Sequence, residues 1–159
     1  MTRLGPVFPF AVLLLLAGCL LSCGCSVTPT AGGGNPPIVG TWLSLPHEQE
    51  DYRELYIFRD TGRTDGALIP LRSGEALGYE AYLQGAWGRD SGPRYLVTGE
   101  TIIHYFSNDT HAAIPIRETF LYDPLDDRLY PEGDARHPLL RVSHEPVIPP
   151  GLDVSIPWD

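Results

Sequence analysis

The stretch Tyr79-Glu80-Ala81-Tyr82-Leu83-Gln84-Gly85-Ala86-Trp87 decides the fold class of this 159-residue chain. Its odd-numbered positions hold apolar or aromatic residues and one glycine, and Glu80, Tyr82 and Gln84 stand between them. Successive side chains of a β-strand point to opposite faces, so this alternation predicts a half-buried strand. The segment 114–122 repeats the pattern. The chain is therefore expected to be built from β-strands.

Shorter apolar segments of strand length lie on both sides of these two. They span residues 38–45, 54–59, 66–71, 94–98, 101–106, 128–130 and 139–142. Clusters of Gly, Pro, Asn and Asp separate them, and Gly99-Glu100 predicts a two-residue hairpin. Short strands joined by tight turns predict an all-β antiparallel meander of about eight or nine strands. Such a sheet loses its exposed edges by curling into a barrel or half-barrel.

The N-terminus has the layout of an export signal. Arg3 is followed by an apolar run over residues 7–16 and then by small residues, which matches the charged, apolar and cleavage regions of a signal peptide. The segment Leu16-Ala17-Gly18-Cys19 resembles the lipobox of bacterial and archaeal lipoproteins. The resemblance implies a signal helix cleaved after Gly18 and a lipid on Cys19, which would anchor the protein to the membrane.

Other interpretations of the N-terminus stay open. Leu20-Leu21-Ser22-Cys23 is a poorer version of the same pattern, so Cys23 is the second candidate for lipidation. An ordinary signal or an uncleaved anchor is the remaining alternative. The apolar run from Val7 to Leu21 has 15 residues, whereas a helix that spans the membrane needs about 20. The length of the run therefore argues against an anchor.

The chain divides by composition into four parts. Residues 1–18 form the lipoprotein signal peptide, 19–37 a Gly/Pro-rich membrane tether, 38–142 the β domain, and 143–159 an extended Pro-rich tail. All three cysteines precede the β domain, which leaves none for a disulfide inside it. The 20 acidic and 11 basic residues give a formal net charge of -9. This acidic balance argues against nucleic acid as a partner.

Several short motifs of the β domain resemble those of lipocalins. They are the Gly-x-Trp triplets Gly40-Thr41-Trp42 and Gly85-Ala86-Trp87, the strand and turn at residues 56–62, and the closing hairpin at 120–123 and 128–130. The whole pattern is most similar to small lipocalin-like domains of unassigned function in exported proteins of methanogenic archaea. It departs from the family at Thr61, which lengthens the Asp-Gly turn by one residue.

The resemblance implies a lipocalin-like barrel in which Gly40, Trp42, Gly85 and Trp87 have structural roles. The tryptophan would close the barrel end, and the glycine would let the backbone curve there. A barrel of this size is either filled by its own side chains or hollow enough for a ligand. Of the 16 Phe, Trp and Tyr residues, 13 lie between positions 42 and 130. This abundance of rings favours a filled interior.

Potential metal ligands are scattered through the chain. The five histidines lack the spacing of a zinc site, and no metal site or cofactor is predicted. His104 and His111, which flank an expected turn, would be the first candidates for such a site. Asp123, Asp126 and Asp127 lack the alternate-residue spacing of a calcium loop, so a solvated turn is predicted there instead.

Two further residues are candidates for a chemical role. Glu118 shares the predicted face of Ile116 and Phe120, and burial on that face would raise its pKa. A buried glutamate paired with an arginine would give the same sequence pattern. Asn108-Asp109-Thr110 is an N-glycosylation sequon in an expected turn, with Asn108 as the acceptor. The sequence contains no nucleophile elbow, phosphate loop or dinucleotide fingerprint. No enzymatic activity is therefore predicted.

The sequence predicts a non-enzymatic lipoprotein that is anchored through Cys19 to the outer face of the cell membrane or envelope. Its β domain is expected to have a binding or scaffolding role. The alternative is a lipocalin-type carrier of a small apolar ligand. That alternative requires a cavity lined by Tyr79, Leu83, Tyr95 and Phe120. The third possibility is an envelope hydrolase. It requires a His or Glu and an Asp to meet in a cleft. It is ruled out if no two of four side chains come within hydrogen-bond reach, namely Glu118, His104, His111 and Asp123.

Overall fold

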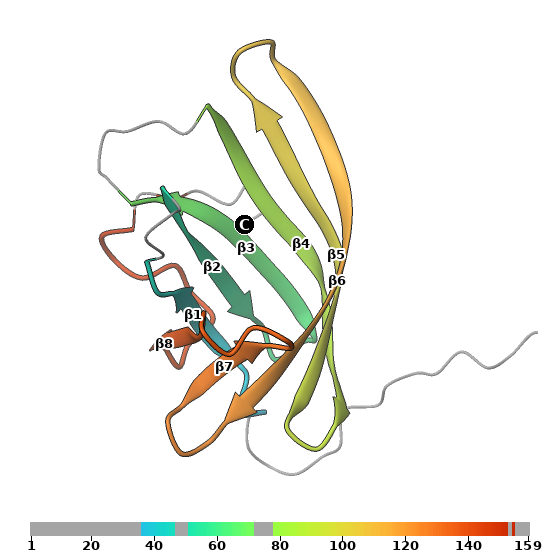
Figure 1. The fold of residues 1–159 in the computed structure, drawn as a ribbon, viewed down its shortest axis with the longest axis vertical. Helices are drawn as coiled ribbons and strands as arrows, with labels where there is room; N and C mark the ends of the chain where they lie inside the picture. The colour runs from blue at the N-terminus through green and yellow to red at the C-terminus, as the bar shows by residue number, and fades with distance from the viewer. Residues whose placement is uncertain (1–35, 47–50, 72–77, 153, 155–159) are drawn as a thin grey trace, which may run out of the picture. The chain divides into compact units, whose positions relative to one another are not determined.

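The computed structural model describes residues 36–46, 51–71, 78–152 and 154, which belong to the compact unit Gly33–Asp159. These residues form eight strands: β1 (Gly40–Ser44), β2 (Tyr52–Phe58), β3 (Arg63–Pro70), β4 (Tyr79–Ser91), β5 (Arg94–Tyr105), β6 (Thr110–Asp123), β7 (Arg128–Pro131) and β8 (Leu139–Ser143). Each strand pairs antiparallel with the next, and β8 returns to β1, so the sheet closes into a barrel (Figure 1). The predicted all-β barrel is confirmed.

The N-terminal predictions concern residues that the structure does not describe. The signal helix, Gly18, Cys19 and Cys23 all lie outside the described ranges, as does nearly all of the tether. Within those ranges, no helix is long and apolar enough to cross a membrane.

The predicted hairpin at Gly99-Glu100 is wrong, because β5 runs straight through it. Gly99 pairs with Gly85 of β4, and the chain reverses instead between Ser91 and Arg94. A Cβ atom at position 99 would lie 2.1 Å from the carbonyl oxygen of Gln84. Glycine is therefore required here for the close approach of two backbones, and not for a turn. This distinction depends on which residue lies opposite, which the local sequence does not encode.

One part of the barrel interior is filled by side chains. The strand register places alternate residues of each strand on the inner face, where an apolar core forms. Its fully or nearly fully buried members are Ile38, Trp42, Tyr56, Phe58, Leu83, Tyr95, Val97, Phe120, Leu129 and Leu139. The rings meet edge to face, as in Tyr56–Phe120, whose centroids are 5.3 Å apart. This aromatic packing stabilises the closed sheet.

A second apolar cluster lies on the outer side of the barrel. Leu43, Leu55, Ile57 and Ile69 are covered there by Ile148, Leu152 and Val154, which follow β8. The Thr41 hydroxyl group donates to the carbonyl oxygens of Glu145 and Val147, at 3.0 and 2.7 Å. The described part of the Pro-rich tail therefore packs along the barrel.

The strands differ greatly in length, and this opens one end of the barrel. β4, β5 and β6 contain 13, 12 and 14 residues, whereas β1, β7 and β8 contain five, four and five. β6 pairs with β7 only from Phe120 to Asp123, so its first part has β5 alone as a neighbour. The β5–β6 hairpin consequently rises beyond the other strands, at the top of Figure 1. We call this end of the barrel the mouth.

Candidate functional site

A cavity of about 430 Å³ opens at the mouth. It is lined by residues of four strands: Tyr52, Glu54, Leu55 and Tyr56 of β2, Ala67 and Leu68 of β3, Tyr79, Ala81, Tyr82 and Leu83 of β4, and Thr101, Ile103 and Tyr105 of β5. This volume lies within the range of small-molecule sites, about 300–1,000 Å³. Tyr56 and Leu83 belong both to this lining and to the buried core. The cavity therefore ends where the packed interior begins.

The walls of the cavity combine aromatic and aliphatic surface. Tyr79 and Tyr105 are cross-strand partners, and their ring centroids are 6.2 Å apart. Ala81 and Ile103 form the next pair towards the core, and both line the cavity. Flat rings beside small aliphatic side chains suit a ligand with an apolar, planar body.

A polar group marks the inner end of the cavity. The buried Tyr56 hydroxyl group donates a hydrogen bond to Oε2 of Glu118, at 3.2 Å. The pKa of Tyr56 is raised well above its usual value. Burial is the largest cause, and the negative charges of Glu54 and Glu118 act in the same direction. Tyr56 therefore stays protonated, and its hydroxyl group remains a hydrogen-bond donor.

The pKa of Glu118 is raised as well, as the sequence analysis anticipated. Its cause is burial, and the hydrogen bond from Tyr56 acts in the opposite direction. An arginine partner, the usual compensation for a buried glutamate, does not contact Glu118 among the described residues. Burial thus favours the neutral carboxyl group.

The four residues named for a carrier cavity fall into two groups. Tyr79 and Leu83 line the cavity, whereas Tyr95 and Phe120 are 1% and 0% exposed inside the packed core. The interior is therefore filled in one part and hollow at the mouth. Strand length explains the division, because β2, β3, β4 and β5 supply the lining of the cavity, whereas the short strands β1, β7 and β8 contribute no described residue to it.

The residues named for a hydrolase do not assemble into one centre. Glu118 faces the barrel interior, seven residues from His111 on the same strand, so the two side chains point to opposite faces. His104 and His111 are cross-strand partners on the outer face. Asp123 accepts a hydrogen bond from the backbone nitrogen of Leu125, at 2.8 Å, within the β6–β7 turn.

The remaining candidates lie in turns. Asp127 binds the guanidinium group of Arg141 and accepts a hydrogen bond from the Tyr122 hydroxyl group. Asp126 is exposed. Asn108 is also exposed, and its Oδ1 accepts a hydrogen bond from the Thr110 hydroxyl group at 2.7 Å, which joins the first and third residues of the sequon.

The two Gly-x-Trp triplets occupy β1 and β4. The indole nitrogen of Trp42 donates to the carbonyl oxygen of Ile38, and that of Trp87 donates to the carbonyl oxygen of Arg59, both at 2.8 Å. Gly40 has a φ of +134°, a conformation that other residues rarely adopt. Gly85 lies against Gly99 in the neighbouring strand.

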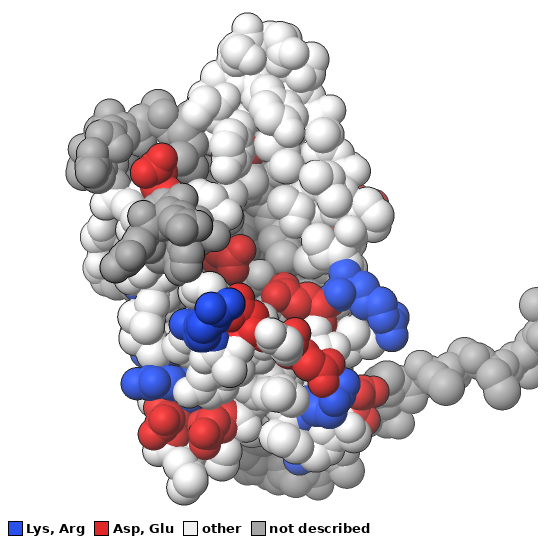
Figure 2. All heavy atoms as spheres, in the orientation of Figure 1, with Lys and Arg blue, Asp and Glu red and all other residues white. Residues whose placement is uncertain are grey.

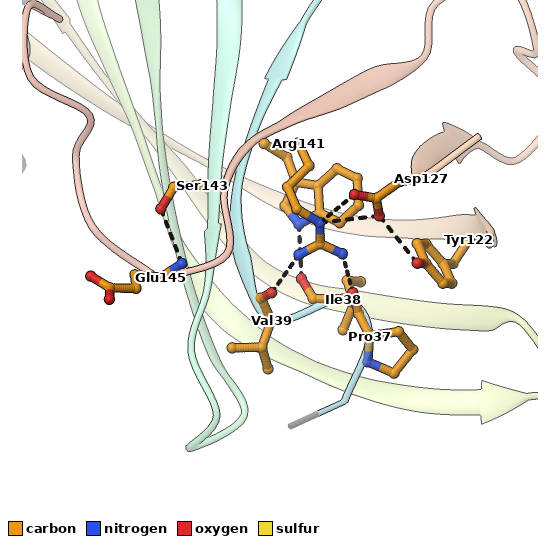
Figure 3. Close-up of polar contacts among 9 residues, drawn as sticks. Pro37, Ile38, Val39, Tyr122, Asp127, Arg141, Ser143 and Glu145 are labelled. Atoms are coloured by element: carbon orange, nitrogen blue, oxygen red, sulfur yellow. Dashed lines mark hydrogen bonds and ion pairs between the residues drawn. The ribbon is translucent and has the colours of Figure 1, made fainter. Parts of the chain in front are cut away.

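Arg141 organises the closure of the barrel (Figure 3) and is not among the residues that the sequence singles out. Its guanidinium group binds Asp127 and donates to the carbonyl oxygens of Pro37 and Val39. These partners lie in the β6–β7 turn and in the segment before β1. A single arginine in a short strand gives no local signal of such a role, because the partners are distant along the chain.

Comparison with protein-family models, curated proteins and solved structures found no match to this chain.

Proposed function

We propose that the protein is a lipid-anchored binding protein of the cell envelope whose barrel takes up a small, largely apolar ligand at its mouth. The observation that carries the proposal is the cavity of about 430 Å³, which remains open although the rest of the interior is packed. Apolar cavities with a few polar groups are the usual form of small-molecule sites. The proposal adopts the carrier alternative and assigns the domain no catalytic role.

The lining specifies the chemistry of the ligand. Tyr79, Tyr105 and the aliphatic side chains beside them offer apolar contact to a flat or branched body. Glu54 contributes a carboxylate to the lining, and Tyr56 contributes its hydroxyl group. Among the described residues, no arginine lines the cavity. The site therefore favours a neutral or cationic molecule with a hydrogen-bond donor over an anion.

The cellular location follows from the N-terminal sequence. Cys19, at the end of the apolar run, would carry the lipid, and Cys23 is the alternative acceptor. The Gly/Pro-rich tether would hold the barrel away from the outer face of the membrane. A binding domain on such a tether meets its ligand outside the cytoplasm.

Binding of the neutral fluorophore N-phenyl-1-naphthylamine tests the proposed cavity. Its fluorescence should rise when it enters the apolar site of the full chain. Thr101→Trp introduces a large ring into the lining and should reduce binding at least about tenfold, since a ring that fills the site excludes the probe.

Ile102→Trp is the matched control, because Ile102 is adjacent on β5 and lies outside the lining. It should leave probe binding unchanged. Equal binding of the fluorophore to the unsubstituted full chain and to Thr101→Trp would refute a ligand site at the mouth. If Thr101→Trp does weaken probe binding, mass spectrometry of small molecules that co-purify with the native protein would identify the natural ligand.

A further inference from the structure

Three potential metal ligands meet on the outer face of the β5–β6 hairpin. His104 and His111 are cross-strand partners, and their rings are stacked with centroids 4.3 Å apart and planes inclined by 15°. Asp109 lies in the connecting turn, with Oδ1 2.8 Å from Nε2 of His104. One ligand atom from each residue lies within 4.8 Å of the others. The strand pairing thus assembles two imidazoles and a carboxylate.

The turn directs the carboxylate of Asp109 towards the two rings. Asp109 has a φ of 52°, in the left-handed region that Asp adopts more readily than most residues. The hydrogen bond between Thr110 and Asn108 closes the turn on either side of it. The position of Asp109 therefore follows from the hairpin geometry.

We propose that His104, Asp109 and His111 bind a divalent transition-metal ion, represented by Zn²⁺. Zinc takes imidazole nitrogen and carboxylate oxygen at about 2.0–2.2 Å, and three protein ligands with water in the fourth position are a common set. Tetrahedral bonds of that length separate neighbouring ligand atoms by about 3.4 Å. Small rotations of the exposed Asp109 and His111 side chains and of the half-buried His104 side chain would bring the ligand atoms to this spacing.

The surroundings of the three ligands favour a cation. The hairpin from Thr101 to Ile116 contains one charged residue, Asp109, and no arginine or lysine. Figure 2 shows that the described residues in the upper part of the molecule in this view, which contains the hairpin, carry no basic side chains on the visible face. No neighbouring positive charge within the hairpin repels the ion or competes for the carboxylate.

The donor set distinguishes among metals. Ca²⁺ prefers six or more oxygen ligands, and this site offers two nitrogens. Imidazole with carboxylate suits zinc and its neighbours in the first transition series. The site lies on the outer face and is independent of the cavity at the mouth, so the two proposals fail or succeed separately.

Titration calorimetry with ZnCl₂ tests the site. The background is the full chain with Cys19→Ser, Cys23→Ser and Cys25→Ser, because thiolates bind zinc strongly. One zinc ion per chain is expected. His111→Gln and Asp109→Asn should each weaken binding at least about tenfold, because each removes one of three ligands.

His137→Gln is the matched control. His137 lies in another His–Asp pair, with Nδ1 2.5 Å from Oδ2 of Asp134, and that pair belongs to no group of three ligands among the described residues. Its replacement should leave zinc binding unchanged. Circular dichroism without metal verifies that each variant is folded. Absence of binding, or equal losses in His111→Gln and His137→Gln, would overturn the proposal.

Discussion

The guanidinium carbon of Arg141 lies 4.0 Å from the ring centroid of Trp42, and this contact joins the last strand of the barrel to the first. The Trp42 ring is fully buried, and the Arg141 side chain is 7% exposed. Arginine stacks well on aromatic faces and donates several hydrogen bonds at once. One side chain thus closes the barrel and holds the segment that enters β1.

Arg141→Met should destabilise the protein by about 2–4 kcal/mol, because it removes a half-buried ion pair with Asp127 and a cation–π contact together. The carbonyl oxygens of Pro37 and Val39 also lose their donor. Urea denaturation measures the change in the free energy of unfolding. Arg117→Met, at an exposed position of β6, is the control and should change it by less than about 0.5 kcal/mol. Equal effects of both substitutions would contradict the role of Arg141.

Gly99→Ala should destabilise the barrel by about 1–3 kcal/mol, because the new methyl group would overlap the backbone of β4. The clash would be with the carbonyl oxygen of Gln84 and the Cα atom of Gly85, at 2.1 and 2.6 Å. Gly78→Ala is the control, since a Cβ atom at Gly78 meets nothing within 4 Å. Thermal unfolding followed by circular dichroism compares the two. A stable Gly99→Ala variant would show that β4 and β5 can separate at this point.

Glu118 should make stability depend on pH. Burial raises its pKa above the ordinary value of 4.5, so the folded state binds the proton more tightly than the unfolded state. The stabilising contribution of the protonated Glu118 is present below pH 4.5. It is lost as the pH rises through the raised pKa of the folded state. Glu118→Gln removes this loss, so the variant should gain stability relative to wild type between about pH 4 and about pH 7.

Urea denaturation at both pH values measures the difference between wild type and Glu118→Gln. Glu100→Gln, at an exposed position of β5, is the control and should show no such gain. A difference between wild type and Glu118→Gln that stays constant with pH would mean that Glu118 does not titrate in this range.

Cys19→Ser should abolish lipid attachment and release the protein from the membrane fraction, since the thiol is the proposed lipid acceptor. Incorporation of radiolabelled lipid measures this directly. Cys23→Ser, four residues away, is the matched control and should remain lipidated. The opposite pattern, with lipid lost only from Cys23→Ser, would assign the modification to Cys23.

Local sequence was sufficient to predict most of the strands and the raised pKa of one residue beside the cavity. Alternating polarity located β4, although the strand continues from Trp87 to Ser91 beyond the predicted end. The same alternation placed Glu118 on an apolar face and anticipated its raised pKa. Both features depend on residues two positions apart, which the period of a strand relates directly.

Local sequence was insufficient wherever the partner lies far along the chain. Gly99-Glu100 has the composition of a turn, and only the register with β4 reveals that Gly99 lies opposite Gly85. The sequence predicts that His104 and His111 flank a turn, but their stacking and the approach of Asp109 depend on how the two strands of the hairpin pair. The contacts of Arg141 with the chain before β1 span more than a hundred residues.

The sequence by itself determined the all-β class, the approximate strands and a largely aromatic interior, because these follow from side-chain polarity at short spacing. Tertiary structure alone decided which part of the interior is filled. Strands β2 to β5 continue past the core and leave a cavity between Tyr79 and Tyr56, whereas the short strands β1, β7 and β8 contribute no described residue to its lining. Such a cavity depends on where strands end relative to one another, and register across the sheet sets that relation.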